Sequence, residues 1–397
     1  MSKRIKVGII GTGGRGTLSF GQGLLCFPNA VEITALCDKN PLRIKGSKAL
    51  TGLTCEEFND HETLLAKADC DTVIVTTPDF THEEITIDCL RAGKNVLCEK
   101  PMAISTAQCD RMMKAERESG RMLMVAFNMR HHAVFMKVQQ IMASGKIGRP
   151  IAVQFLDYYP GGNFYFRRWH RLKENSGGLL IHKGSHDFDL FNWIIGAKPT
   201  AISAFSSVGK YNPIPGAGVR CRDCSITKDC VDYFDLNKEK NEPYRKLYRD
   251  AESVDQYYID RCVYTSDKDT GDHSTIIIEY DNGCHVSYLE SFLGNVTETG
   301  GRYITIFAEH GQLWASDNAM QVKVMFDKGQ PPEVYDIKRN EADGHGGADD
   351  AEIRAFIESL QQGRHMVANS EAGRLAVMMG EAAEKSAEEK RVIPLKG

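Results

Sequence analysis

The chain has 397 residues, which at about 150 residues per domain suggests two or three domains. Its 49 basic and 53 acidic residues give a net charge of −4, and this mildly acidic balance argues against a dedicated nucleic-acid binder, which needs clustered cations. No apolar run approaches the ~20 residues of a membrane span, and no signal-peptide pattern precedes the first apolar stretch. We therefore expect a soluble, cytoplasmic protein that binds neither nucleic acid nor membrane.

Short apolar strands alternate with helices over the first 126 residues. Strands are predicted at residues 5–10, 31–37, 72–76, 95–98 and 122–126, and helices at 82–92 and 105–118. Strands separated by helices form βαβ units, whose right-handed crossovers place helices on both faces of a parallel sheet. The sequence thus predicts an α/β protein whose residues 1–126 form a doubly wound Rossmann domain.

The pattern changes from about residue 150. Strands are predicted at 151–158, 201–208, 274–280, 285–289, 303–308 and 321–326, and helices at 349–362 and 370–388. Turn signals join most of these strands, so residues 127–397 are expected to form a second α/β domain around a largely antiparallel sheet. The closing helices, 349–388, could pack back toward the first domain. The polar stretch from Lys210 to Asp260 lacks periodicity, and we expect it to be functional or held by a staple.

A glycine-rich loop follows the first predicted strand directly. It matches the pattern G-x-G-x-x-G with Gly11, Thr12, Gly13, Gly14, Arg15 and Gly16. The glycines allow a tight turn, a close approach of a pyrophosphate, and packing of the next helix on the strand. Asp38 ends the second strand, where a carboxylate binds the adenosine ribose and repels a 2′-phosphate. We therefore expect NAD rather than NADP, although Lys39 and Arg43 could soften the repulsion.

Two further loops follow the third and fourth predicted strands. The first contains Thr76, Thr77 and Pro78 and leads to His82, and the second contains Glu99, Lys100 and Pro101. Ligands of open parallel sheets bind at the carboxyl ends of the strands, so both loops are expected to line the cofactor cleft. Asn128 follows the last strand of this domain and is expected to face the same cleft.

These loops, together with Gly177-Gly178 leading to His186 and Asp189, resemble the Gfo/Idh/MocA family of NAD(P)-dependent oxidoreductases, which act on sugars and cyclitols. The resemblance covers essentially the whole chain, including residues 344–349. It implies an N-terminal Rossmann domain and a C-terminal α/β domain on an open, mostly antiparallel sheet. Such a sheet commonly makes homo-oligomer contacts (a dimer or tetramer), and Lys100 is implied to lie beside the nicotinamide and the substrate hydroxyl.

The catalytic segment departs from the family at one position. His186 falls on the family's catalytic histidine, whereas His182 stands where the family has an aspartate. This change puts the usual Lys–Asp–His arrangement in doubt. Lys183 and Asp187 could replace part of the electrostatic role of the missing carboxylate.

The same residues follow from the chemistry of hydride transfer, which needs a base for the hydroxyl proton and a cation for the developing alkoxide. His186 has the ordinary pKa of a proton shuttle at neutral pH. Lys100 would stabilise the alkoxide, or act as the base if burial lowers its pKa. His182 lies four residues before His186 and shares its helical face. It could orient the substrate, pack or cap a helix, or hold a divalent metal together with His186.

Three further residues are candidates for substrate contact. Arg168 and Trp169 precede the Gly177 motif, and an indole beside a guanidinium suits stacking under a sugar or nicotinamide. His345 lies in the glycine-rich segment before the closing helices.

Four cysteines around the polar stretch form a separate motif. Cys221, Cys224 and Cys230 are spaced C-x2-C-x5-C, and Cys262 follows at a distance. Four thiolates can close a tetrahedral, structural zinc site, which would hold the polar stretch in place. The alternative is a set of reduced thiols that bind nothing.

The leading functional hypothesis is an NAD-dependent oxidoreductase acting on a secondary carbinol of a sugar, glycoside or cyclitol. A redox-assisted NAD-dependent glycosidase or lyase, and a catalytically silent NAD-sensing regulator, remain as alternatives. Net formation of NADH distinguishes the first from the other two.

Overall fold

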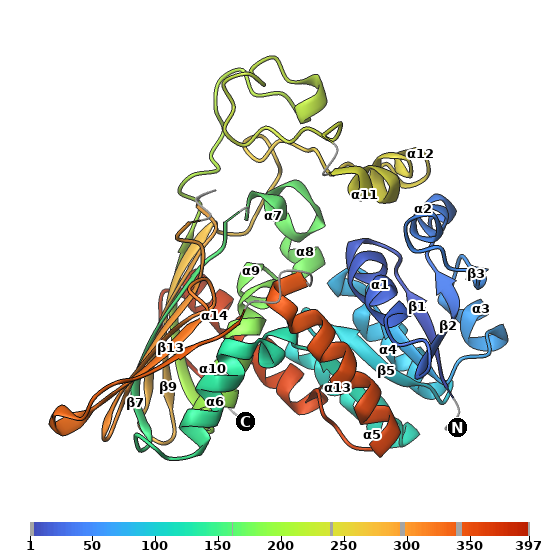
Figure 1. The fold of residues 1–397 in the computed structure, drawn as a ribbon. Coiled ribbons are helices and arrows are strands. Elements are labelled where there is room, and N and C mark those ends of the chain that lie inside the picture. Colours follow the sequence, from blue (N-terminus) through green and yellow to red (C-terminus); the bar gives the residue numbers. More distant parts are fainter. Residues whose placement is uncertain (1–3, 161, 239–240, 294–297, 339–343, 396–397) are drawn as a thin grey trace.

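The computed structural model describes residues 4–160, 162–238, 241–293, 298–338 and 344–395 (Figure 1). Six parallel strands build the first sheet: β1 (Ile5–Ile10), β2 (Val31–Cys37), β3 (Glu56–Phe58), β4 (Thr72–Val75), β5 (Asn95–Glu99) and β6 (Leu123–Ala126). Their order is β6-β5-β4-β1-β2-β3, so the chain changes direction across the sheet between β1 and β4. This confirms the doubly wound Rossmann domain. Strand β3 escaped prediction because it has three residues and exposes two glutamates.

Helices cover both faces of this sheet, as the βαβ pattern requires. They are α1 (Gln22–Leu25), α2 (Pro41–Thr51), α3 (His61–Lys67), α4 (His82–Arg91) and α5 (Thr106–Ser119). Side-chain caps fix where three of them begin, because Asn40, Asp60 and Ser105 accept hydrogen bonds from the first turns of α2, α3 and α5. The strand interiors are fully buried, with Val7, Ile74 and Leu97 at 0 % exposure.

The second sheet has nine strands in the order β14-β13-β12-β11-β7-β10-β9-β8-β16. They are β7 (Pro150–Tyr158), β8 (Pro199–Ser207), β9 (His273–Tyr280), β10 (His285–Ser291), β11 (Gly301–Ala308), β12 (Gly311–Ser316), β13 (Gln321–Phe326), β14 (Glu333–Asp336) and β16 (Ile393–Pro394). All neighbours are antiparallel except β7 and β10. The predicted mostly antiparallel sheet is thus confirmed, and β12, β14 and β16 are additions to it.

Three helices pack on one face of the second sheet: α6 (Ala133–Ala143), α10 (Gly184–Ile195) and α14 (Ser370–Glu389). Figure 1 shows them between this sheet and the Rossmann domain, while no described helix lies on the opposite face. The second sheet is therefore open on one side.

The end of the chain returns to the Rossmann domain. Helix α13 (Ala348–Gln362) buries Ile353 and Phe356 in the same core as Phe20 and Leu24. Strand β15 (Ala368–Asn369) then pairs antiparallel with β6 and becomes the outermost strand of the first sheet. The closing segment therefore helps to build the domain with which the chain begins.

The polar stretch after β8 reaches across to the Rossmann domain, where α11 (Glu242–Tyr244) and α12 (Glu252–Asp255) lie beside α2 (Figure 1). Arg222 holds it together, because its guanidinium lies 2.6 Å from carboxylate oxygens of both Glu252 and Asp260. In the described parts of the chain, no helix has both the length and the apolar character needed to cross a bilayer.

Candidate cofactor and active site

The glycine loop lies at the point where the first sheet changes direction. Gly11 has φ of +97°, and a Cβ added there would lie 2.7 Å from the Thr76 carbonyl carbon. A Cβ on Gly16 would lie 1.9 Å from the Gly11 carbonyl oxygen, which excludes any side chain. Thr76 ties the two strand ends together, because its hydroxyl donates to the Gly11 carbonyl oxygen at 2.6 Å. The glycines therefore serve the turn and the close packing that their spacing predicts.

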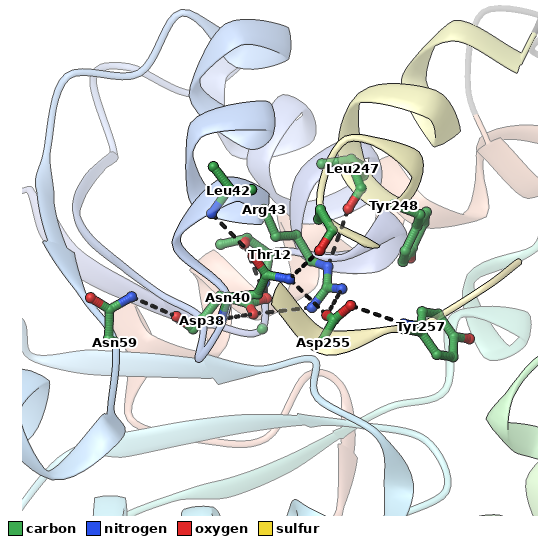
Figure 2. A network of polar contacts seen from close by, with 12 residues as sticks. Thr12, Asp38, Asn40, Leu42, Arg43, Asn59, Leu247, Tyr248, Asp255 and Tyr257 are labelled. Atoms are coloured by element: carbon green, nitrogen blue, oxygen red, sulfur yellow. Dashed lines mark hydrogen bonds and ion pairs between the residues drawn. The ribbon is translucent and has the colours of Figure 1, made fainter. Parts of the chain in front are cut away.

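Asp38 stands next to this loop at the end of β2 and is buried. Its carboxylate accepts hydrogen bonds from the Thr12 amide at 3.0 Å and from the Asn40 amide at 2.9 Å (Figure 2). Arg43 Nη1 lies 3.2 Å from the same carboxylate, while Arg43 Nη2 pairs with Asp255. Two carboxylates therefore flank one guanidinium, and the local charge is negative.

The loops after β4 and β5 are tied together by His82. Its ring nitrogens lie 2.9 Å from the carbonyl oxygens of Thr77 and Pro101, so the buried ring joins the Thr76–Pro78 loop to the Glu99–Pro101 loop. Glu99 accepts a hydrogen bond from the Lys100 amide at 2.9 Å and pairs with the Arg15 side chain. Arg15 also pairs with Asp349 at 3.1 Å. These contacts bring the predicted cofactor residues to one edge of the sheet.

Lys100 projects from the end of β5 toward the second domain. Its Nζ donates to the His182 carbonyl oxygen at 3.0 Å. Burial lowers the pKa of Lys100 to about 8, although the carboxylates of Glu99 and Asp79 oppose this shift. A substantial fraction of Lys100 is thus neutral close to physiological pH and can accept a proton.

His182 contacts a residue that sequence reasoning did not single out. His182 Nδ1 lies 2.6 Å from Asp79 Oδ2, and both side chains are buried. Burial raises the pKa of Asp79 and lowers the pKa of His182, and the positive charge of Lys100 lowers the latter further. Asp79 directly follows Pro78 in the loop expected to line the cleft. This position in the loop could have identified Asp79 as a site residue from the sequence. Its contact with His182, 103 residues away, could not be predicted in that way.

Aromatic rings surround His182 on its other sides. The centroid of the His170 ring is 4.5 Å from that of His182, and the Trp169 and Tyr165 rings are each 5.4 Å away. Trp169 itself stacks on His170 at 3.9 Å. His170 is a second candidate missed from the sequence, and its buried Nδ1 has no hydrogen-bond partner among the described residues.

His186 and Lys183 lie further along the same segment. His186 is buried in α10, and its ring packs edge-on to Phe127 at 6.1 Å between centroids. The charge of His186 contributes to the lowered pKa of His182, after burial, Lys100 and His170.

Lys183 forms a buried ion pair with Asp157 of β7. Asp187 accepts from the Tyr288 hydroxyl at 2.7 Å and pairs with Arg302 at 2.6 Å. Lys183 and Asp187 are thus held by contacts with the second sheet. The carboxylate that contacts His182 comes from Asp79 instead.

Asn128, Arg168 and His345 are the remaining predicted site residues. Asn128 is buried and donates to Asp349 Oδ1 at 2.7 Å. The Arg168 guanidinium lies over the Phe164 ring at 4.0 Å and over the Tyr248 ring at 4.9 Å. His345 belongs to a short helical turn, Gly344–Gly347, and its side chain lies outside the described part of the structure.

The structure does not support the predicted structural zinc site in the residues that it describes. Cys221, Cys224, Cys230 and Cys262 do line one small cavity of about 10 Å³, and all four are free thiols. Yet among the residues that the structure describes, no group of three or more histidine, cysteine or acidic side chains is arranged to hold a metal, at the cysteines or at His182 and His186. Arginines hold this stretch in place instead. Besides the Arg222 ion pairs, Arg167 donates to the Arg261 carbonyl oxygen at 2.9 Å and to Cys221 Sγ at 3.2 Å.

Comparisons with known proteins agree with this geometry. Residues 5–127 match the family model described as the oxidoreductase family, NAD-binding Rossmann fold. Residues 139–395 match the model of the same family's C-terminal alpha/beta domain. The myo-inositol 2-dehydrogenase of Thermotoga maritima is 24% identical over 98% of both chains, and YteT of Bacillus subtilis is 29% identical over 93% of this chain and 92% of its own.

Solved structures show the same fold. A levoglucosan dehydrogenase in complex with NADH and levoglucosan superposes with a TM-score of 0.77 and 16% identity, covering 100% of both chains. The WlbA dehydrogenase of Bordetella pertussis, in complex with NADH and UDP-GlcNAcA, gives a TM-score of 0.72 with 20% identity over 100% of both chains. Both domains of the protein are accounted for by these matches, and the chain belongs to the Gfo/Idh/MocA family of NAD-binding oxidoreductases.

Proposed function

We propose that the protein transfers a hydride between NAD and a secondary carbinol of a sugar, glycoside or cyclitol. The observation that carries this proposal is the position and pKa of Lys100. It stands at the carboxyl end of β5, is buried, and has a pKa lowered to about 8. A lysine of that pKa at the edge of a dinucleotide-binding sheet suits removal of a hydroxyl proton. The relatives named as inositol and levoglucosan dehydrogenases support the substrate class.

The residues at the edge of the first sheet fit a dinucleotide. Gly11 to Gly16 leave backbone approachable where a side chain would block it, and Asp38 presents a carboxylate at the end of β2. Thr76 to Pro78, Glu99 and Asn128 would line the nicotinamide half of the site. NAD, when bound, supplies the hydride acceptor. Asp38 stays at the end of β2, where its carboxylate would repel a 2′-phosphate, and this favours NAD over NADP.

The proton chemistry falls to the chain's own side chains. Neutral Lys100 accepts the proton of the substrate hydroxyl, and its protonated form then stabilises negative charge on that oxygen. Asp79 and His182 share one proton in their 2.6 Å contact and hold the His182 backbone against Lys100 Nζ. His186 would exchange the proton between this site and water. Arg168 and Trp169 would contact the substrate ring.

A turnover assay tests the proposal against its alternatives. The protein is incubated with NAD and a panel of sugars, glycosides and cyclitols while the absorbance of reduced nicotinamide is followed. Net NADH formation that disappears in Lys100→Met supports the proposal. Product formation without net NADH would indicate the glycosidase or lyase chemistry instead, and NAD binding without any product would indicate a regulator.

We also propose that the open face of the second sheet joins copies of the chain. Exposed apolar side chains gather on its strands, including Phe205 at 66 %, Ile277 at 48 % and Leu289 at 40 % exposure. Exposed apolar side chains that gather on one face of a sheet commonly mark a protein–protein contact. A homo-oligomer, a dimer or tetramer, would bury it.

A further inference from the structure

The cofactor edge of the Rossmann domain is covered by part of the protein itself. Residues 242–255, here called the covering segment, comprise α11, the turn Arg245–Arg249 and α12. Figure 2 shows Asp255 of this segment beside Arg43 and Asn40, both of which contact Asp38. The contact joins the end of the polar stretch to the loop and helix that a dinucleotide would use.

The closest contact is made by Tyr248 on the glycine loop. The Gly14 amide donates to the Tyr248 hydroxyl oxygen at 2.8 Å. A Cβ added to Gly13 would lie 3.0 Å from the same oxygen, so the hydroxyl stands directly on the surface that these glycines leave free. Backbone amides of this loop are the donors that a pyrophosphate uses in Rossmann folds. The phenol oxygen therefore takes the place of a phosphate oxygen.

Several backbone contacts hold the segment against α2. Arg43 Nε donates to the Leu247 carbonyl oxygen at 3.2 Å, and Asn40 Nδ2 donates to the Ala251 carbonyl oxygen at 3.0 Å. A Cβ on Gly46 would lie 2.6 Å from the Lys246 carbonyl oxygen, so the two backbones meet at a glycine. Asn40 Nδ2 also donates to Asp255 at 2.8 Å. The segment is thus docked on α2 and on Asn40, the residue that caps this helix.

Tyr248 is fixed from the substrate side as well. The Arg168 guanidinium lies over its ring at 4.9 Å and over the Tyr244 ring at 5.3 Å. The Arg43 guanidinium lies 5.5 Å from the Tyr248 ring centroid. Two cations thus hold one half-buried phenol between the glycine loop and the candidate substrate residue Arg168.

We propose that the covering segment competes with the dinucleotide for the glycine loop, with Tyr248 in the place of the pyrophosphate. One amide cannot donate full hydrogen bonds to a phenol and a phosphate at once, so the cofactor has to displace Tyr248. Displacement also removes two of the rings over which Arg168 lies, Tyr244 and Tyr248, and leaves only Phe164. The segment therefore links cofactor binding to the position of a substrate-contacting arginine, whatever substrate the enzyme takes.

Binding measurements on the full chain test this without any turnover. Tyr248→Phe removes the hydroxyl and leaves the Gly14 amide without its partner in the covered state, which is worth about a two- to tenfold change in an equilibrium. We expect NAD and ADP-ribose, which both carry a pyrophosphate, to bind more tightly by that factor in calorimetric titrations. Adenosine, which lacks phosphate, should bind unchanged. Tyr233→Phe, an exposed tyrosine of the same polar stretch, is the matched control and should bind all three like the unmodified protein.

The same variant can also refute the proposed competition. Weaker or unchanged binding of NAD in Tyr248→Phe would overturn the proposal, because the hydroxyl would then be a phosphate ligand or have no role. Hydrogen exchange on the unmodified protein provides a second measurement that needs no variant. Saturating NAD should increase amide exchange in residues 242–255, whereas increased protection there would refute displacement. Because neither measurement uses a substrate, failure of the proposed dehydrogenase activity would leave both readouts intact.

Discussion

The lowered pKa of Lys100 predicts how the rate of substrate oxidation depends on pH. With the ordinary pKa of 10.5, about 0.1% of the lysine would be neutral at about pH 7.5, whereas a pKa of about 8 makes about a quarter of it neutral. Lys100 can act as a base only in its neutral form, so burial raises the fraction of enzyme with a usable base by about two orders of magnitude. We expect kcat/KM for oxidation at saturating NAD to rise about tenfold per pH unit below pH 8 and to level off above it. In the reducing direction the proton donor is the charged form, so the rate should fall above the same pH.

Two variants separate the base from a merely cationic role. Lys100→Arg keeps a positive charge that cannot be removed in this range, and Lys100→Met removes the charge. If Lys100 is the base, both variants should lose about 10²- to 10⁴-fold in kcat while NAD affinity changes little. The residual activity should no longer show the inflexion near pH 8. A flat profile in the unmodified protein, or the same inflexion in Lys100→Arg, would refute the assignment and direct attention to His186.

Four further predictions concern the rest of the molecule. Asp79→Asn removes the carboxylate beside His182 and should lower kcat about 10²-fold with an unchanged Kd for NAD; lost NAD binding would contradict this positioning role. Asp38→Ser should shift the ratio of NAD to NADP affinity toward NADP, and equal affinities in the unmodified protein would refute the charge argument. Arg222→Ala removes the ion pairs of Arg222 with Asp260 and Glu252 and should destabilise the polar stretch by about 2 kcal/mol, seen as faster limited proteolysis between residues 210 and 260, with unchanged cleavage as the contrary result. Phe205→Asp on the open sheet should reduce the mass measured by light scattering, and an unchanged mass would contradict an oligomer contact at this face.

The local patterns of the chain were sufficient for the architecture of the first domain. Short apolar runs located β1, β2, β4, β5 and β6, because parallel strands that are buried on both faces are continuously apolar. The glycine loop could be assigned from its spacing together with the strand before it and Asp38 after it. The structure shows that the backbone of Thr76 requires a glycine at Gly11 and that the Gly11 carbonyl oxygen requires one at Gly16. The second sheet was also predictable in kind. Its edge strands β14 and β16 were not, because four and two residues carry too little periodicity to be distinguished from loops.

Asp79, Tyr248 and Arg222 show what only the tertiary structure decided. Asp79 meets His182 across 103 residues, and Tyr248 meets Gly14 across 234. Such pairs arise where two domains pack against each other, and no local pattern encodes which side chains then come together. The same holds for the cysteine spacing, which predicted a metal where Arg222 ion pairs supply the staple. The sequence by itself determined the scaffold and the residues at its carboxyl edge. Packing between the domains determined the partners of those residues, because contact free energies between distant segments depend on geometry that periodicity does not contain.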